Sequence, residues 1–284
     1  MKALSAVKFA LLATVLLLAA SCSMRRFALD NYAWLSTRLA VSYLDLNGSQ
    51  KEAFTVALAN LSKKIRDQHL QDTIAIVQSM ADATAPVPLL ERLETRFRLV
   101  LAEGCSDFAP LVASLDLPQL DHLRGKLAER DEKYDPAANG GVADLRKRRS
   151  EDSRELATRW LGTLTPQQVE ILEGSGLEMD SEGKWERDYL AYRTDAQGAF
   201  LRLIVAGRGM PLIFEQQCRH FVENQDPFLT DAGRQVRLQV RDRRKTLTSA
   251  LFASMQPEQR SHFRLQIAAL AKDLSFWGEQ IVNQ

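Results

Sequence analysis

Ser181 and Lys184 stand three residues apart, the spacing at which a lysine can activate a serine for acyl transfer. That chemistry requires both side chains on one turn of a buried helix, and Gly183 lies between them. Neither Ser-Asp-Asn nor Lys-Thr-Gly, the partner motifs of such a pair, occurs elsewhere in the chain. We therefore interpret Ser181 as the N-cap of the helix that follows it, not as a nucleophile.

Histidine and cysteine side chains, the usual metal ligands, do not cluster in the sequence. No His-x-His, His-Glu-x-x-His or Cys-x-x-Cys motif is present, and neither a Gly-x-Ser-x-Gly elbow nor a glycine-rich phosphate loop occurs. The four histidines are scattered along the chain: His69, His122, His220 and His262. The sequence predicts no cofactor and a protein that binds something rather than an enzyme; a cell-wall enzyme is the distant alternative.

The N-terminal residues have the order of an export signal. Lys2 and Lys8 flank the start of an uncharged run, residues 9–20, which is too short to span a bilayer as a structural helix. Small residues end this run just before Cys22. We predict a secretory signal peptide over residues 1–21, which is removed.

Cys22 resembles the cysteine of the bacterial lipobox, whose thiol is diacylated and becomes the mature N-terminus. Position 19 is Ala, where that motif prefers Leu, Val or Ile, and an ordinary signal peptide with a chance cysteine is the alternative. Acyl chains on Cys22 would hold residues 22–284 on a membrane, because each buried CH₂ group contributes about 0.8 kcal/mol. Ser23 follows the cysteine instead of Asp, which in such lipoproteins implies the outer membrane and its periplasmic face.

The charge of the mature chain is nearly balanced. The full sequence has 37 Lys and Arg against 36 Asp and Glu, and the signal peptide holds two lysines and no acid. The remaining net charge of about −1 argues against a nucleic-acid partner, which would need a basic surface.

Cys105 and Cys218 remain once Cys22 is assigned to lipid. Two cysteines in an oxidising compartment often pair, and closing so long a loop stabilises a fold by roughly 4 kcal/mol in the chain-entropy model. Two buried free thiols are the alternative. We predict the disulfide.

Three short segments share one layout: an apolar residue, a polar residue, Pro or Gly, any residue, and Gln. They are Leu46-Asn47-Gly48-Ser49-Gln50, Leu164-Thr165-Pro166-Gln167-Gln168 and Met255-Gln256-Pro257-Glu258-Gln259. A capping box explains the second segment. The Thr165 hydroxyl can accept from the backbone N–H three residues on, Pro166 suits the first helical position, and Gln168 can reach back to the cap.

The other two segments fit the same scheme. Asn47 with Gln50 forms the same box, and Pro257 marks a third helix start after a weaker cap, Gln256. The layout therefore predicts three helix N-termini. A client-binding role would instead require Gln50 and Gln168 to be exposed on a common surface.

Basic residues crowd one stretch near the C-terminus. At about 100° per residue, five of them share one side of a helix, opposite Val236 and Val240. They are Arg234, Arg237, Arg241, Arg244 and Lys245. This side is either a solvated face paired with acids or a contact for anionic lipid or lipopolysaccharide.

A second basic and aromatic group lies next to the predicted anchor. Arg25 and Arg26 precede Phe27 and Trp34 with almost no tether after Cys22. Arg and Trp are favoured at headgroup level, so this helix is expected to lie near the membrane surface. The alternative places Trp34 in the core.

The elements that must position these residues are helices. Apolar residues recur every three or four positions, and no strand-like alternation of any length is present. The fold class is all-α, a bundle or two packed sub-bundles, with a sub-boundary expected in the "DPAANGG" loop at residues 135–141. Helices are predicted around residues 28–46, 54–80, 89–100, 120–127, 142–161, 185–203 and 263–281.

The Leu-Thr-x-x-Gln layout resembles that of the Spy/CpxP-type periplasmic proteins, small helical envelope-stress proteins of which one acts as an ATP-independent chaperone. A second resemblance covers nearly the whole mature chain, to a family of Gram-negative outer-membrane lipoproteins of unknown function. It rests on Cys22, Asn31-Tyr32-Ala33-Trp34-Leu35, Tyr43-Leu44-Asp45-Leu46 with Gln50, Trp160 before the Leu164–Gln168 segment, Trp185 and Arg193. Asn47 stands where that family usually has Thr.

This family resemblance implies a helical fold and an envelope location but no activity. We expect a lipid-anchored periplasmic protein that binds or chaperones envelope proteins. A structural or assembly partner of an envelope complex is the alternative.

Overall fold

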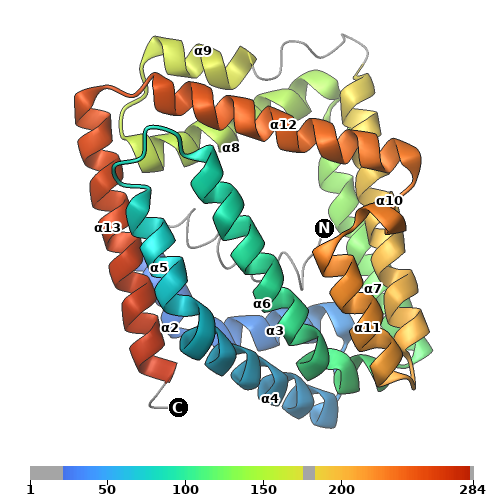
Figure 1. The fold of residues 1–284 in the computed structure, drawn as a ribbon. Coiled ribbons are helices and arrows are strands. Elements are labelled where there is room, and N and C mark those ends of the chain that lie inside the picture. Colours follow the sequence, from blue (N-terminus) through green and yellow to red (C-terminus); the bar gives the residue numbers. More distant parts are fainter. Residues whose placement is uncertain (1–21, 175–182, 282–284) are drawn as a thin grey trace.

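The computed structural model describes residues 22–174 and 183–281, and every regular element in these ranges is a helix. The predicted signal peptide, residues 1–21, and the predicted N-cap Ser181 lie outside the described residues. The all-α class expected from the sequence is confirmed. In Figure 1, α12 runs across the top and α13 along the left, while α4 lies at the bottom and α7, α10 and α11 on the right.

The first half of the chain contains α2 (Cys22–Asp30), α3 (Tyr32–Leu44), α4 (Gly48–Lys64), the π-helical turn η1 (Ile65–His69), α5 (Leu70–Ser79), α6 (Val87–Ala113), α7 (Leu117–Asp131), η2 (Glu132–Tyr134) and η3 (Ala137–Asn139). The second half contains α8 (Val142–Leu161), α9 (Pro166–Gly174), α10 (Lys184–Gly207), α11 (Pro211–Glu223), η4 (Asp226–Phe228), α12 (Asp231–Ala253) and α13 (Pro257–Gln280).

Helix starts agree with the three capping segments, and helix lengths partly depart from the periodicity. The helix predicted at residues 28–46 is divided at Asn31 into α2 and α3. The one predicted at 54–80 begins earlier and runs through α4, η1 and α5 without a gap. The third, predicted at 89–100, continues as α6 through Pro110 to Ala113, and Leu111 and Val112 beyond this proline are buried.

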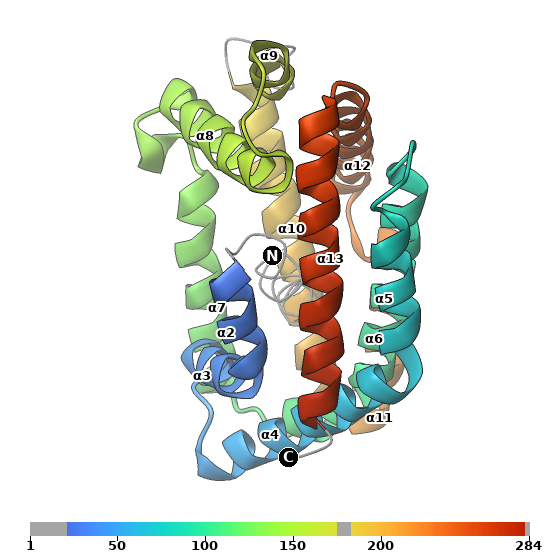
Figure 2. The same cartoon turned by 90° about the vertical axis from the view of Figure 1, so that its left-hand side faces the viewer.

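Two main hydrophobic clusters form the core, and each draws on both halves of the chain. One joins residues of α5, α8 and α13, among them Ile74, Leu161 and Ile267. The other joins residues of α6, α7, α10 and α11, among them Leu127 and Phe221. Figure 2 shows α13 between α2 and α5, and α13 packs against both. The chain is therefore folded back across residues 135–141, with α7 on α10 and α5 on α13.

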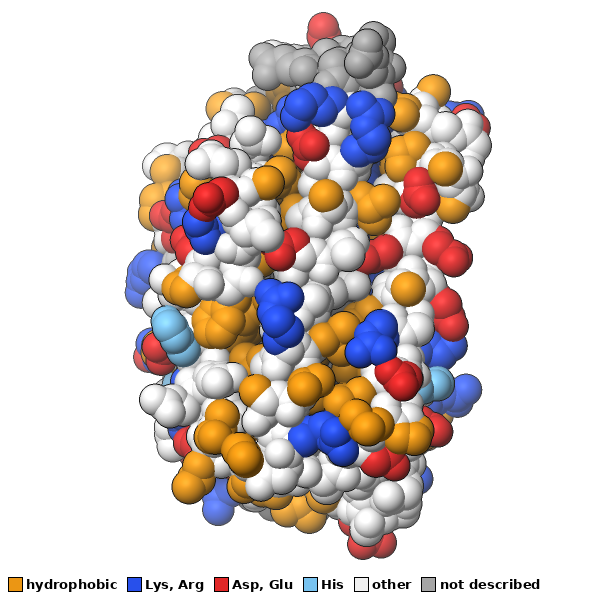
Figure 3. Space-filling model, turned by 90° about the vertical axis from the view of Figure 1, so that its right-hand side faces the viewer, with side chains coloured by type: hydrophobic (Ala, Val, Ile, Leu, Met, Phe, Trp, Pro, Cys, Tyr) orange, Lys and Arg blue, Asp and Glu red, His pale blue; other side chains and the backbone are white. Residues whose placement is uncertain are grey.

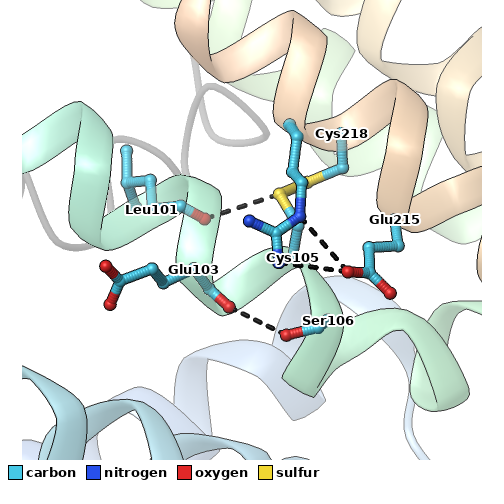
Figure 4. Close-up of a disulfide and its surroundings, with 7 residues drawn as sticks. Leu101, Glu103, Cys105, Ser106, Glu215 and Cys218 are labelled. Carbon is cyan, nitrogen blue, oxygen red and sulfur yellow. Dashed lines mark hydrogen bonds and ion pairs between the residues drawn. A yellow bond between two sulfur atoms is a disulfide. The ribbon is translucent and has the colours of Figure 1, made fainter.

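The predicted disulfide is present and links the halves covalently. Cys105 on α6 and Cys218 on α11 are bonded, with their Cα atoms 5.8 Å apart (Figure 4). The bond joins residues 113 positions apart in the sequence. In the chain-entropy model, a loop of this length contributes about 4–5 kcal/mol to stability.

Candidate functional site: two paired-glutamine junctions

The turn between α3 and α4 begins with the predicted capping box. The Asn47 side-chain oxygen accepts from the Gln50 backbone N–H at 3.0 Å, and the Gln50 side-chain oxygen accepts from the Asn47 N–H at 3.2 Å. Two backbone donors at the start of α4 are satisfied in this way.

A fourth capping box, which the sequence analysis missed, starts α7. The Asp116 carboxylate accepts from the Gln119 N–H at 2.8 Å, and the Gln119 side-chain oxygen accepts from the Asp116 N–H at 3.1 Å. Here Pro118 stands one position later than in the other segments, which hid the match. The usable signal is a repeated Gln-x-x-His-apolar pattern, Gln119 to Leu123 and Gln259 to Phe263.

Gln50 and Gln119 also bind each other, side chain to side chain. The Gln50 amide donates to the Gln119 oxygen at 3.0 Å, and the Gln119 amide donates back at 2.6 Å. Each amide has a second acceptor: the Ser114 carbonyl for Gln50 at 3.0 Å, and the Asp45 carbonyl for Gln119 at 2.9 Å. Both side chains are buried, and every donor and acceptor of the two amides is used.

An equivalent junction joins the α8–α9 turn to the α12–α13 turn. The Gln168 and Gln259 amides donate to each other's oxygens at 2.8 and 2.7 Å. Their second acceptors are the Ser254 carbonyl at 3.3 Å and the Thr163 carbonyl at 2.7 Å. The carbonyls of Ser114 and Ser254, and those of Asp45 and Thr163, therefore have corresponding roles in the two junctions.

The helix starts at this second junction follow the sequence prediction. The Thr165 hydroxyl accepts from the Gln168 N–H at 3.2 Å, and Gln168 accepts from the Thr165 N–H at 3.0 Å. Gln259 reaches back to the Gln256 N–H at 3.0 Å. Pro166 and Pro257 occupy the first helical positions.

The correspondence extends beyond the glutamines. Nε2 of His122 on α7 contacts the Ser42 carbonyl of α3 at 3.0 Å, and Nε2 of His262 on α13 contacts the Arg159 carbonyl of α8 at 3.1 Å. A carbonyl only accepts, so each imidazole donates from Nε2. Equivalent helices are in contact in the two places: α3 packs against α7 at the first junction, and α8 packs against α13 at the second. The chain thus contains two copies of one four-helix arrangement.

Burial decides between the two interpretations of the capping segments. Gln168 is 0% exposed, and Gln50 is also buried, so the two side chains do not share a surface. A buried amide that lost its partner would leave unpaired polar groups in the core, which costs about 1–3 kcal/mol for each group. These junctions are structural links between helix pairs, and any binding surface must lie outside them.

A second polar network braces α7 and α8 against α10. Arg193, fully buried, donates to Asp131 at 2.7 Å and lies 3.6 Å from the centre of the Tyr134 ring. Arg146 holds Glu186 through two bonds of 2.9 Å. Burial acts to raise the pKa of Glu186, but the hydrogen bonds from Arg146 and its own backbone, with the nearby arginine charges, hold it below its ordinary value. An ionised carboxylate held in this way is a brace and not a proton donor at neutral pH.

The basic side of α12 is largely paired within the molecule. Arg234 and Arg237 form ion pairs with Asp231 and Asp226. Lys245 binds Glu91 on α6 at 2.5 Å, which lowers the pKa of Glu91. Of the five predicted contact residues, Arg241 and Arg244 are the exposed ones. Arg241 also lies 3.9 Å from Asp242, so pairing with acids, the first of the two interpretations, accounts for four of the five.

Solvent reaches large apolar side chains on several helices, and two groups of them are candidate contact surfaces. On α2 and α3, Trp34 is 55% exposed and Phe27 is half exposed, so Trp34 is not a core residue. At the end of the molecule near the first junction, the α10–α11 turn lies beside the α6–α7 turn. We call the exposed side chains there the apolar pole: Leu117, Met210, Leu212 and Ile213.

Figure 3 shows the face on which α7, α10 and α11 lie, with hydrophobic side chains gathered on its lower part. A shallow hollow of about 410 Å³ lies at the other junction, between α9 and the end of α12, and Ile171, Ala253 and Met255 help to line it. Among residues 22–174 and 183–281, no group of three or more His, Cys, Asp or Glu side chains is arranged to hold a metal ion. No helix in these ranges combines the length and apolarity that a membrane span needs.

Comparisons with known proteins returned no match of this chain to a family model, a curated protein or a solved structure.

Proposed function

We propose that this protein is a lipid-anchored periplasmic protein that binds apolar segments of other envelope proteins. The observation that carries the proposal is the apolar pole. Leu212 is 79% exposed, and the other members of the pole, Leu117, Met210 and Ile213, are each more than two-fifths exposed. Exposed apolar patches on soluble domains mark contact sites, and methionine adapts to varied partners.

The backbone beneath the pole is held firmly. The Gly209 N–H donates to the Ala113 carbonyl at 3.0 Å, and Arg208 Nε donates to the Leu115 carbonyl at 2.9 Å. The Cys105–Cys218 disulfide fixes α11 to α6 a few turns away. A patch held in place before its partner arrives loses little conformational freedom on binding, which favours affinity.

The envelope location rests on the sequence. A signal peptide over residues 1–21 and acylation of Cys22 would place the chain on the periplasmic face of the outer membrane, where a disulfide persists. Cys22→Ser is expected to release the protein from the membrane fraction of a Gram-negative cell. Unchanged fractionation of this variant would contradict the anchor.

The test of binding measures how far this protein suppresses the aggregation of a chemically reduced model protein. Light scattering follows the aggregation. Met210→Ser combined with Leu212→Ser should weaken the suppression severalfold and leave the unfolding midpoint unchanged. Leu265→Ser is the matched control, because Leu265 is 69% exposed on α13, away from the pole. Equal suppression by the pole variant and wild type would overturn the proposal.

The alternative, an assembly partner of an envelope complex, is favoured by the rigid construction of two linked helix arrangements. It predicts one stoichiometric complex in which the pole is buried against a fixed partner. Photo-crosslinking from position 212 in intact cells separates the two functions, since a chaperone yields many adducts and an assembly partner yields one.

A further inference from the structure

The outward face of α2 and α3 carries two exposed aromatic side chains on a nearly continuous helix. The Asn31 N–H donates to the Phe27 carbonyl at 3.0 Å, and the Leu35 N–H donates to the Asn31 carbonyl at 2.9 Å. The helical hydrogen bonds therefore pass through the break at Asn31. At about 100° per residue, positions 27, 34 and 38 lie on one face.

The opposite face of this segment is fixed to the rest of the molecule. Leu29 is buried in the core, and Tyr32 packs edge-on against Trp277 with ring centres 5.6 Å apart. Arg25 is buried and bonds Asp273 of α13 at 3.3 Å. Because α2 and α3 are held from within, the exposed face cannot turn inward to bury its aromatic rings.

Two exposed arginines lie on this segment, and the guanidinium of Arg38 lies over one of the exposed rings. The Arg38 guanidinium lies 5.3 Å from the centre of the Trp34 ring, and that of Arg26 lies 4.0 Å from the centre of the Phe276 ring. Asp30, the acid within this stretch, is 4.0 Å from Arg26. Both arginines are exposed, so their donors can reach anionic groups outside the protein.

We propose that this face, the aromatic stripe of Phe27, Trp34 and Arg38 with Arg26 at its edge, lies on a bilayer that contains anionic phospholipid. Trp and Arg are side chains that the interface of a bilayer favours, with the ring at headgroup level and the guanidinium near phosphate. Phe27 follows Cys22 by five residues, about 7.5 Å along a helix, so an acylated Cys22 would keep the stripe at the membrane.

The inference extends the proposed function and rests on its anchor for the position of the stripe. It assigns α2 and α3 to the lipid, which leaves the apolar pole for protein partners. Contacts of the stripe with the headgroups would add to the membrane affinity that acyl chains on Cys22 provide.

The test uses the protein produced from the full chain in Gram-negative cells, purified in detergent and reconstituted into phosphatidylethanolamine–phosphatidylglycerol vesicles. Lipids brominated near the carbonyl quench a tryptophan that sits in the interface. We expect brominated vesicles to lower the emission, and Trp34→Phe to abolish this loss. Trp277 is buried, Trp160 packs against Phe263, and Trp185 lies on α10 beneath the Arg243 guanidinium, so none of these three should respond.

A second measurement separates the stripe from the anchor. Cys22→Ser protein is incubated with the same vesicles, and each of Arg26→Gln and Arg38→Gln should reduce partitioning about fivefold, the contribution of one basic residue near an anionic surface. Arg264→Gln is the matched control, since Arg264 is similarly exposed and paired with Asp82. It should bind as Cys22→Ser does.

The outcomes distinguish the two ideas. Anchored protein with no quenching of Trp34 would overturn the stripe and leave the anchor standing. Quenching of Trp34 together with unchanged fractionation of Cys22→Ser would support the stripe and overturn the anchor.

Discussion

The two glutamine junctions share the same hydrogen bonds between their buried amides, and they differ in what covers them. In both, a pair of buried amides links two turns, and each amide reaches a backbone carbonyl of the partner turn. At the first junction the α10–α11 turn covers the α6–α7 turn, with bonds to the Ala113 and Leu115 carbonyls. At the second, Ala253 and Met255, the residues in corresponding positions, line an open hollow.

The difference comes from α11. The first half of the chain passes from α5 to α6 through a short turn, whereas the second half inserts α11 and η4 between α10 and α12. This inserted helix carries Cys218 and two residues of the apolar pole, Leu212 and Ile213, and Met210 is its N-cap residue. The comparison separates two tasks. The paired amides, which both junctions share, hold the fold together. The inserted helix α11, which only the first junction has, is the place to look for binding.

The largest expected effect on stability comes from removing the disulfide, the covalent link that only the first junction has nearby. Cys105→Ala combined with Cys218→Ala should lower the free energy of unfolding by about 4–5 kcal/mol, because the unfolded chain regains the freedom that the long loop had lost. Urea unfolding under non-reducing conditions measures it. A loss below about 1 kcal/mol would show that the bond does not constrain the unfolded chain in this way.

The next effect tests whether the two glutamine pairs are equivalent. Gln168→Leu should cost roughly 3 kcal/mol or more, because the buried Gln259 amide loses its partner and the Thr165 N–H loses its acceptor. Gln50→Leu should cost a similar amount at the first junction. Gln167→Leu, at an exposed neighbour, should stay within about 0.5 kcal/mol of wild type.

Double variants test whether the two glutamines of one junction stabilise the fold through their contact with each other. Gln168→Leu and Gln259→Leu together should cost about 1–3 kcal/mol less than the sum of the single changes, since they share one network. Gln168→Leu with Gln50→Leu should be additive. Additive behaviour within one pair would contradict the bonded geometry.

A smaller effect concerns the turn that covers the first junction. Gly209 has φ of 66°, a left-handed backbone conformation that a β-branched side chain adopts only with strain. Gly209→Val should therefore destabilise the protein by about 1–3 kcal/mol and disturb the apolar pole. Gly48→Ala is the control at an unobstructed helix start, and it should be neutral or slightly stabilising.

The smallest effect compares the caps themselves. Thr165→Ala and Asn47→Ala should each cost about 0.5–2 kcal/mol, while Thr165→Ser should be nearly neutral. Thermal unfolding resolves differences of this size. A Thr165→Ser protein that keeps its stability but loses binding would show that the segment is a binding site after all.

Sequence reasoning reached most of the helices, three of the four capping boxes and the cysteine pair, because these depend on local pattern or on composition, but it did not predict α11. It did not find the pairing of Gln50 with Gln119, since that bond joins turns 69 residues apart. It also missed Asp131 and Glu186, whose partners Arg193 and Arg146 lie on other helices. The exposure of Trp34 and Leu212 depends on how whole helices pack, which periodicity alone does not specify.

The central claim is that the shared junctions hold the fold while the apolar pole binds. The most direct test measures suppression of aggregation and the unfolding midpoint for Gln168→Leu and for the Met210→Ser, Leu212→Ser variant, at a temperature where both are folded. The account predicts a lowered midpoint with intact suppression for Gln168→Leu, and an intact midpoint with weakened suppression for the pole variant. Loss of suppression in folded Gln168→Leu, with full suppression by the pole variant, would contradict it.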